Sequence, residues 1–269
     1  MPNPVGVFDS GIGGVSVLTA IRKELPTIDL IYVGDNIHLP YGEKSMEEIK
    51  TYSHGVAEFL RDKGCRVIVI ACNTASAAAL RYLREEFQDI TFIGMEPAVK
   101  PAAEQTQTGV VGVMATTATF QGELFASVVE RFAAGVKVIQ QPCPGLVQQI
   151  EAGELDTPKT MRMLREWLEP MQEQNIDRLV LGCTHYPFVR KAIHEILGDK
   201  VTIIDPAPAI AKQVRRVLES MNDIPSPVHG ETEWYTSGNP EVFAETLLRL
   251  TESEQKIKGL TWTENRLHE

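Results

Sequence analysis

Residues 67–74 read Val67-Ile68-Val69-Ile70-Ala71-Cys72-Asn73-Thr74, and this stretch indicates the fold class. Four β-branched apolar residues in succession are typical of a strand that is buried on both faces, as in a parallel sheet. A cysteine and two polar residues follow at once, before a helical pattern begins. Because ligands of such sheets bind beyond the carboxyl ends of the strands, we expect this turn to carry chemistry.

The same pattern occurs again over residues 179–185, which read Leu-Val-Leu-Gly-Cys-Thr-His. A buried strand, a small residue, a cysteine and polar residues again precede a helix. We interpret the repetition as two similar α/β halves that face each other. Chain crossings near Glu96-Pro97 and Asp205-Pro206 would make the second half, residues 98–206, an insertion into the first, residues 1–97 and 207–269.

Short apolar runs alternate with longer helical patterns along the rest of the chain. The runs are rich in Val and Ile, and they predict strands at 5–8, 30–33, 67–71, 110–114, 136–139, 179–181 and 201–204. The helical patterns cover 47–63, 75–87, 121–132, 158–174 and 210–221. This alternation predicts an α/β protein, with two pseudo-symmetric α/β domains and largely parallel sheets. Residues 222–233 are expected to form a loop, and the charged tail beyond them to add a helix to the first half.

The composition is that of a globular protein with an acidic surface. The 36 acidic and 26 basic residues give a net charge of −10, so nucleic acid and anionic membranes would find no basic face. No apolar run approaches the roughly 18 residues of a membrane-spanning helix. The first residues carry neither the basic nor the long apolar region of a secretory signal. We therefore expect a cytoplasmic protein with no nucleic-acid or membrane partner.

The chain has four cysteines, Cys65, Cys72, Cys143 and Cys183. In a reducing compartment they should be free thiols, and the absence of Cys-x-x-Cys or His-x-x-x-His spacing argues against a metal site. Cys65 and Cys143 are expected to pack in the core. Cys72 and Cys183 stand before helices, where the N-terminus can lower a thiol pKa from about 8.5. Either one alone would pass for a small buried hydrophobe, but the matched pair favours a reactive role.

Two opposed thiols suit the inversion of a stereocentre. One thiolate removes the α-proton from one face, and the other thiol delivers a proton to the opposite face. The roles exchange after turnover, so the two groups must be chemically alike. We find no placed lysine for a pyridoxal Schiff base and no ligand set for a metal, so we expect no cofactor.

Three ionisable residues could assist the thiols. His185 stands two positions beyond Cys183 and could tune or protonate it, although a lone histidine is often structural. Asp9 could play the matching part for Cys72, or it could cap the helix that follows. Glu151 ends a helix-like run and would otherwise be a solvated surface carboxylate.

Polar and glycine-rich turns supply candidate binding groups. Residues 9–14, Asp-Ser-Gly-Ile-Gly-Gly, follow a strand and could cradle a carboxylate or phosphate, but they lack the Lys-Ser/Thr of a P-loop. Tyr41 could cover a site or simply pack. Thr116 and Thr119 could donate hydroxyls to a carboxylate or cap a helix.

Four motifs, in this order along the chain, resemble those of the glutamate racemases of bacterial cell-wall synthesis, within the aspartate/glutamate racemase superfamily. They are Phe8-Asp9-Ser10-Gly11-Ile12-Gly13-Gly14, Pro40-Tyr41-Gly42, Ala71-Cys72-Asn73-Thr74-Ala75-Ser76 and Gly182-Cys183-Thr184-His185-Tyr186-Pro187. The resemblance implies an active site in the cleft between the two domains and cofactor-independent racemisation of glutamate. It also implies a D-glutamate product for peptidoglycan and cell shape, and a homodimer.

The resemblance assigns roles to individual residues. Cys72 and Cys183 are the implied acid–base pair, with Asp9, His185 and Glu151 as auxiliary catalytic residues. The expected substrate pocket combines the residues implied by the resemblance with the two threonines named above. It comprises Asp9, Ser10, Pro40, Tyr41, Gly42, Cys72, Asn73, Thr74, Thr116, Thr119, Cys183, Thr184 and His185.

Other functions remain open from the residues. A racemase for aspartate or another amino acid would use the same pair of thiols, and a single-cysteine decarboxylase of the same fold would need only one. A two-lobed, non-catalytic amino-acid-binding or phosphate-binding protein would explain the glycine loop but not the two matched thiols. A thiol hydrolase using Cys183 and His185 would leave Cys72 unexplained, and their two-residue spacing is awkward for a nucleophile–base pair.

Overall fold

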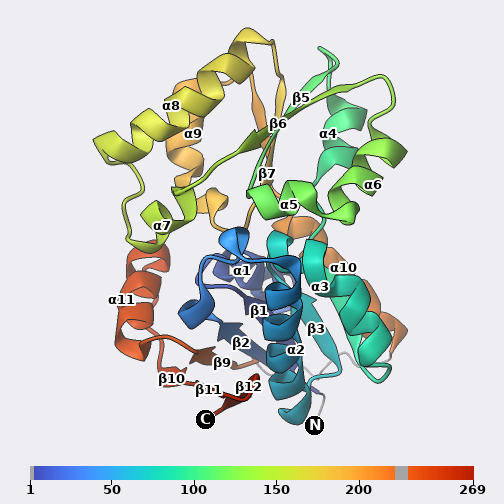
Figure 1. Ribbon diagram of the computed structural model, residues 1–269, viewed down its shortest axis with the longest axis vertical. Coiled ribbons are helices and arrows are strands. Elements are labelled where there is room, and N and C mark those ends of the chain that lie inside the picture. Colours follow the sequence, from blue (N-terminus) through green and yellow to red (C-terminus); the bar gives the residue numbers. More distant parts are fainter. Residues whose placement is uncertain (1–2, 222–229) are drawn as a thin grey trace.

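The computed structural model describes residues 3–221 and 230–269, and its strands form two separate parallel sheets (Figure 1). A six-stranded sheet, in the lower half of Figure 1, has the order β10-β9-β2-β1-β3-β4. A four-stranded sheet in the upper half has the order β6-β5-β7-β8. All neighbouring strands of both sheets are parallel, which confirms the predicted fold class.

The two sheets use different parts of the chain. The six-stranded sheet combines N-terminal and C-terminal segments, β1 (Val5–Asp9), β2 (Leu30–Gly34), β3 (Val67–Ile70), β4 (Thr91–Gly94), β9 (Thr232–Thr236) and β10 (Ile257–Gly259). The four-stranded sheet uses the middle of the chain, β5 (Val110–Ala115), β6 (Lys137–Pro142), β7 (Arg178–Gly182) and β8 (Thr202–Ile204). The chain therefore crosses between β4 and β5 and returns after β8. The domain limits at residues 97/98 and 206/207 stay a prediction.

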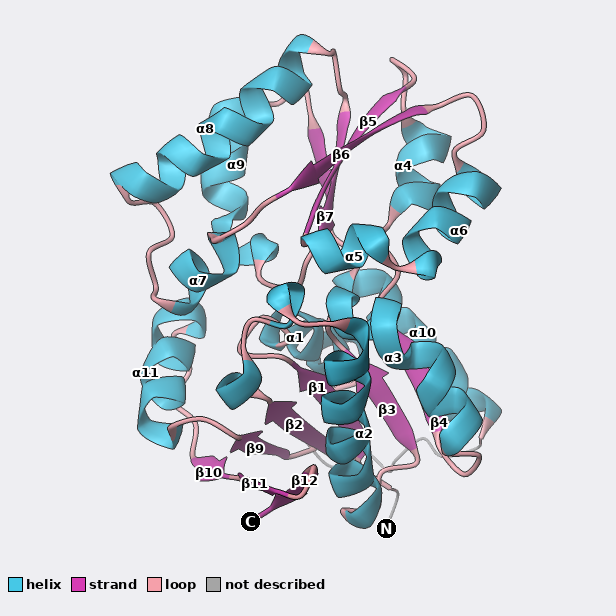
Figure 2. Ribbon diagram, in the orientation of Figure 1, coloured by secondary structure: helices cyan, strands magenta, loops and turns pink. Residues whose placement is uncertain are grey.

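Helices flank the strands of both sheets (Figure 2). In the first half, α1 packs against α10 and α2 packs against α3; in the second half, α8 packs against α9 and α4 against α6. The helices are α1 (Val15–Glu24), α2 (Met46–Asp62), α3 (Asn73–Glu86), α4 (Val99–Gln105), α5 (Thr117–Gln121), α6 (Glu123–Phe132), α7 (Leu146–Glu151), α8 (Pro158–Glu173), α9 (Arg190–Leu197), α10 (Ala207–Ser220) and α11 (Pro240–Thr251). Within residues 3–221 and 230–269, none of them combines the length and apolarity that crossing a membrane requires.

The buried strands β1, β2, β3, β5 and β7 are largely apolar because each sheet has a hydrophobic core on both faces. Successive side chains of a strand point to opposite faces. Val67 and Val69 of β3 belong to the core beside α1 and α10, whereas Ile68 and Ile70 belong to the core beside α2 and α3. The uninterrupted apolar run at residues 67–70 is therefore explained by burial of this strand on both faces.

The C-terminal tail differs from the sequence prediction. Thr232–Thr236 forms β9, so the predicted loop is too long at this end; residues 222–229 lie outside the described part of the chain. The tail contains the expected helix, α11, but also β10 and an antiparallel hairpin of β11 (Thr261–Thr263) and β12 (Arg266–His268). Each of these three strands has only three residues, which is too short for a clear hydrophobic period.

The predicted helix at 121–132 is confirmed as α6, which begins two residues later, at Glu123. The short helix α5, Thr117–Gln121, was not predicted. The two helices meet at Gly122, whose backbone is extended.

The glycine-rich turn after β1 is anchored by Tyr32 of β2. The buried Tyr32 hydroxyl donates a hydrogen bond to the Gly11 carbonyl oxygen at 2.7 Å. The Asp35 N–H donates to the Asp9 carbonyl oxygen at 3.0 Å, which continues the β1–β2 pairing into the turn. The core of the first sheet thus sets the position of residues 9–14.

Replacing Tyr32 with Phe tests this anchor. The substitution removes the one hydroxyl that satisfies the Gly11 carbonyl, so we expect the free energy of unfolding to fall by about 2 kcal/mol. Tyr82→Phe on the half-buried side of α3 is the matched control and should change it by less than about 0.5 kcal/mol. Chemical denaturation measures both, and equal effects of the two substitutions would contradict the anchoring role.

Candidate active site

Cys72 stands where β3 ends and α3 begins. Its sulfur accepts a hydrogen bond from the Ala75 N–H at 3.4 Å, so the side chain caps the helix. The thiol also donates to Ser10 Oγ at a distance of 4.0 Å. Only 5% of Cys72 is exposed, and the group is therefore shielded from bulk water.

The electrostatics of Cys72 differ from the sequence expectation. Burial, followed by the negative charge of Asp9, raises the pKa of the Cys72 thiol well above its usual range. The hydrogen bond from Ala75 lowers this pKa but does not outweigh burial. The prediction that the helix N-terminus lowers the pKa of Cys72 is therefore wrong, because burial and Asp9 together raise it by more. The raised pKa favours the protonated thiol.

Cys183 occupies the equivalent position in the other sheet, directly after β7. Its sulfur lies 3.8 Å from His185 Nδ1, and 8% of the residue is exposed. The sequence argument that a two-residue spacing is awkward for a thiol–imidazole pair is therefore wrong. The tight turn after β7 brings the two side chains together.

His185 connects Cys183 to Glu151. His185 Nε2 lies 2.6 Å from Glu151 Oε1, and only 1% of His185 is exposed. Burial alone would lower the pKa of His185, but the interactions with Cys183 and Glu151 outweigh burial and raise it well above the usual range. His185 is therefore a buried imidazolium that can exchange a proton with the Cys183 sulfur.

Glu151 also joins the two halves of the molecule. Its Oε1 accepts a hydrogen bond from the Ile12 N–H of the glycine-rich turn at 2.9 Å. The interpretation of Glu151 as a solvated surface carboxylate is therefore wrong. A glycine is required at residue 13, because a Cβ there would lie 2.4 Å from His185 Nδ1.

Asp9 lies on the Cys72 side of the site and is fully buried. Its Oδ2 accepts the Gly14 N–H at 2.9 Å, and its Oδ1 accepts the Thr184 hydroxyl at 3.4 Å. Burial raises the pKa of Asp9, and the positive charge of His185 partly offsets this. Asp9 does not cap α1, whose N-cap is Gly14 without a side-chain cap.

The two thiols share one site. The charge of Cys183 contributes to the raised pKa of Cys72, and Asp9 interacts with both the Cys72 side chain and His185. The Ser16 hydroxyl of α1 also donates to the Thr184 carbonyl oxygen at 3.1 Å. The carboxyl ends of β1 and β3 in one sheet therefore meet that of β7 in the other.

Polar side chains follow Cys72 on α3, and one of them, Asn73, lacks a hydrogen-bond partner in the described residues. The side-chain amide of Asn73 is 2% exposed, and neither its oxygen nor its nitrogen has a hydrogen-bond partner within residues 3–221 and 230–269. Thr74 Oγ1 lies 2.8 Å from Thr116 Oγ1 and 3.2 Å from Thr119 Oγ1. A buried amide without a partner is costly, so its site is suited to a polar ligand.

The Pro40-Tyr41-Gly42 segment approaches the second half of the molecule. A Cβ at Gly42 would lie 2.9 Å from Thr116 Cβ, so this segment and Thr116 are in close contact. The hydroxyl of Tyr41 donates to Asp35 Oδ2 at 2.7 Å. The Tyr41 hydroxyl therefore serves to hold the segment, which sequence reasoning did not foresee.

Sequence reasoning also missed Asp35, Tyr32 and Ser16. Asp35 could have been found from the sequence, since it follows the apolar run of β2 and therefore lies at the carboxyl edge of the sheet, as Cys72 does after β3. Cys65 and Cys143 lie in hydrophobic cores, as expected, and burial raises the pKa of Cys65 to about 12. In the described residues, no group of three or more His, Cys, Asp or Glu side chains is arranged to hold a metal ion.

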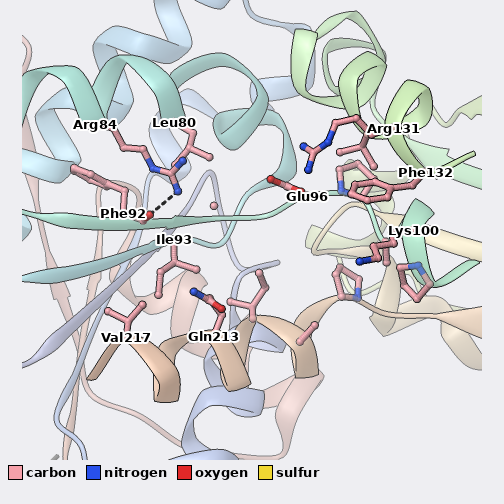
Figure 3. A pocket seen from close by; sticks show the side chains of 18 of the residues that line it. Leu80, Arg84, Phe92, Ile93, Glu96, Lys100, Arg131, Phe132, Gln213 and Val217 are labelled. Atoms are coloured by element: carbon pink, nitrogen blue, oxygen red, sulfur yellow. Dashed lines mark hydrogen bonds between the residues drawn. The ribbon is translucent and has the colours of Figure 1, made fainter. Parts of the chain in front are cut away.

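A separate cavity of about 560 Å³ lies at the chain crossing and contains none of the predicted site residues (Figure 3). Arg84, Lys100 and Arg131 border it, and Arg84 donates to the Phe92 carbonyl oxygen at 2.9 Å. Pro97 and Pro206, beside the two crossings, also line this cavity. It is lined by neither Cys72 nor Cys183.

Known proteins resemble this chain over nearly its full length. The family model for Asp/Glu/Hydantoin racemase matches residues 11–214. A glutamate racemase of Stutzerimonas stutzeri is 48% identical over 244 residues, which cover 91% of this chain and 92% of the relative. A solved glutamate racemase isoform of Bacillus anthracis is 30% identical, with a TM-score of 0.88 and 98% of both chains covered. The glutamate racemase of Francisella tularensis in complex with D-glutamate is 32% identical, with a TM-score of 0.84 and 97% and 98% covered.

Glu151→Gln tests the electrostatic link to His185. The amide removes the negative charge that helps to raise the pKa of His185, so we expect the imidazole to titrate at lower pH than in the unchanged protein. NMR titration of the histidine ring protons measures this shift. The exposed His194, which pairs with Asp199, is the internal control and should not move. An unaltered His185 titration would contradict the assigned cause.

Proposed function

This chain belongs to the Asp/Glu/hydantoin racemase family, and from that membership we propose that it interconverts L-glutamate and D-glutamate. The pair of buried thiols carries the proposal. Cys72 and Cys183 follow strands of two different sheets and interact electrostatically in one site. Relatives that align over nine-tenths of the chain are glutamate racemases, which favours glutamate over aspartate.

The thiols act as an acid and a base on opposite faces of the α-carbon. In the L-to-D direction, the Cys183 sulfur takes the α-proton and Cys72 donates its own proton to the other face. In the D-to-L direction, the sulfur of Cys72 takes the proton and Cys183 returns one. The high pKa of Cys72 fits the first direction, since the thiol there must hold its proton.

Each thiol has its own group for resetting its protonation state. Asp9 interacts with Cys72, and the His185–Glu151 pair serves Cys183. A carboxyl with a raised pKa can exchange a proton with the neighbouring Cys72 sulfur, and the His185 imidazolium stabilises the thiolate form of Cys183. After an L-to-D turnover Cys183 carries one proton more and Cys72 one fewer, so the pair is reset by a D-to-L turnover or by loss of a proton to water from Cys183 and uptake of one by Cys72.

The polar groups around the thiols supply the substrate contacts. We assign the carboxylates of glutamate to the side chains of Ser10, Asn73, Thr74 and Thr184, with Thr116 and Thr119 completing the hydroxyl cluster. The unpartnered Asn73 amide supports this assignment, because a carboxylate would satisfy its donor. Pro40, Tyr41 and Gly42 close the pocket from the loop after β2.

We further propose that the enzyme works without a cofactor, as a cytoplasmic homodimer that supplies D-glutamate for peptidoglycan. Free thiols favour a reducing compartment, and the cysteines of the described residues are unpaired. The domain limits at 1–97 with 207–269 and at 98–206 belong to the same proposal. They place the active site in the cleft, where closure excludes water from the reacting carbon.

The first test is racemisation by the purified protein. We expect L-glutamate and D-glutamate each to lose optical rotation without added pyridoxal phosphate, metal or nucleotide. Chelators and carbonyl reagents should leave the rate unchanged, because neither thiol needs a cofactor. L-aspartate, assayed in parallel, distinguishes a glutamate racemase from an aspartate racemase. A requirement for added pyridoxal phosphate, or faster turnover of aspartate, would overturn the proposal.

The second test separates the two thiols. Cys72→Ser and Cys183→Ser should each lower racemisation by at least about 10²–10⁴-fold, because a serine hydroxyl is a far weaker acid than a thiol. Elimination from threo-3-chloroglutamate needs only one base. Each variant keeps one of the two thiols and should therefore still eliminate from one of the two isomers. We expect Cys183→Ser to eliminate from the D-isomer and Cys72→Ser from the L-isomer.

Proton exchange in D₂O and melting curves complete the experiment. The melting curves establish that both serine variants fold. Loss of elimination from both isomers in both variants, or full racemisation by either one, would show that the two-thiol assignment is wrong.

A further inference from the structure

Asp35 is a buried carboxylate for which the racemisation chemistry has no use. It follows β2 at the carboxyl edge of the six-stranded sheet and is fully shielded from solvent. Its Oδ2 accepts from the Tyr41 hydroxyl at 2.7 Å and lies 2.9 Å from His38 Nδ1. Its Oδ1 accepts from the Ser237 hydroxyl at 2.7 Å and from Trp262 Nε1–H at 2.8 Å. A carboxylate has about four acceptor positions, and all of them are engaged here.

The four partners of Asp35 come from two separate parts of the chain. His38 and Tyr41 belong to the loop 36–43, which carries the Pro40-Tyr41-Gly42 segment toward Thr116. Ser237 follows β9, and Trp262 lies on the C-terminal hairpin β11–β12. Asp35 therefore connects a loop of the candidate active site to a hairpin more than 200 residues away in the sequence.

Aromatic contacts strengthen this connection. The His38 ring stacks on Tyr52 of α2, with ring centroids 3.7 Å apart and planes 8° apart. The Trp262 ring meets His38 edge-on at 5.2 Å and Tyr52 at 6.1 Å. The hairpin also packs along α2 through β12. The indole of Trp262 is thus held in a fixed place from which its N–H reaches the carboxylate.

We propose that Asp35 and Trp262 are positioning residues that hold the Pro40-Tyr41-Gly42 segment in its substrate-binding place. The C-terminal hairpin then sets the affinity for glutamate without touching it. The proposal rests on the proposed function, because that function places glutamate against this segment. Without the hairpin's hydrogen bond, the loop would sample more conformations, and the substrate would have to order it on binding.

The consequence for kinetics is specific. In the proposed function the segment closes the pocket and supplies no acid or base to the α-carbon, so we expect it to contribute equally to substrate and transition-state binding. Loss of such uniform binding raises KM and leaves kcat unchanged. A residue needed only for folding would instead lower the active fraction and therefore kcat, with KM unchanged.

Trp262→Phe is the decisive variant, because it removes the N–H donor and keeps an aromatic ring. We expect KM for glutamate to rise about tenfold with kcat within about twofold of the unchanged enzyme. Asp35→Ala removes both carboxylate oxygens and should raise KM at least as much. The double variant should be no worse than Asp35→Ala alone, since both changes remove the same hydrogen bond.

Arg266→Ala is the matched control. Arg266 lies on the same hairpin but pairs with Glu58 of α2, so its loss loosens the hairpin without touching Asp35. We expect its KM to be unchanged. An equal rise of KM in Arg266→Ala and Trp262→Phe would overturn the role of the Trp262–Asp35 hydrogen bond.

Hydrogen exchange of the peptide that covers residues 36–43 gives a readout independent of turnover. We expect faster exchange in Trp262→Phe and unchanged exchange in Arg266→Ala. Unaltered exchange in Trp262→Phe, or faster exchange with unaltered KM, would overturn the proposal. If the unchanged enzyme did not turn over glutamate, the proposed function would be wrong, and the inferred effect on glutamate affinity would be wrong as well. The exchange results would still show whether Trp262 holds the loop 36–43.

Discussion

The hydrogen bond between His185 and Glu151 is the interaction on which most of the active site depends. Together with the interaction between His185 and Cys183, it raises the pKa of a buried imidazole whose burial alone would lower that pKa. The same Glu151 oxygen accepts the Ile12 N–H from the opposite half, so one carboxylate fixes the position of the glycine-rich turn as well. The turn must approach closely, and a Cβ at Gly11 would lie 2.2 Å from that oxygen.

The two cysteines are equivalent in position but not in their surroundings. Each follows a strand and precedes a helical turn, which is the likeness that a two-base racemase requires. Cys72 is accompanied by a carboxyl group, Asp9, whereas Cys183 is accompanied by an imidazole bound to a carboxylate. In the mechanism that we propose, the two half-reactions therefore use similar sulfur atoms in different electrostatic surroundings. Burial is common to both sides and makes each charged group depend on its partner.

The supporting structure is drawn from the whole chain. Tyr32 anchors the glycine-rich turn, and Asp35 fastens the adjacent loop to Ser237 and Trp262. These residues lie on β2 or beyond it, and β2 pairs with both β1 and β9. The first sheet is therefore completed by the C-terminal tail, and the tail stabilises the loops that face the second half.

The parallel α/β architecture and the place of the two thiols can both be inferred from the amino-acid pattern. Residues 67–70 and 179–181 are apolar without a break, which is the pattern of strands covered on both faces, and the polar residues after them had to lie at the carboxyl edge. The likeness of the two cysteine contexts was visible in the same way.

The pairing of side chains and the direction of their pKa shifts depend on contacts that form only in the folded chain. Glu151 ends a helix and has no local sign of its contact with His185, and the high pKa of Cys72 comes from burial that exists only once the halves have closed. Trp262 likewise contacts Asp35 from a hairpin whose strands are too short for a hydrophobic period to predict them. Periodicity reports how neighbouring residues alternate between core and solvent, whereas a pKa or a hydrogen bond between distant segments depends on the distance and burial that folding creates.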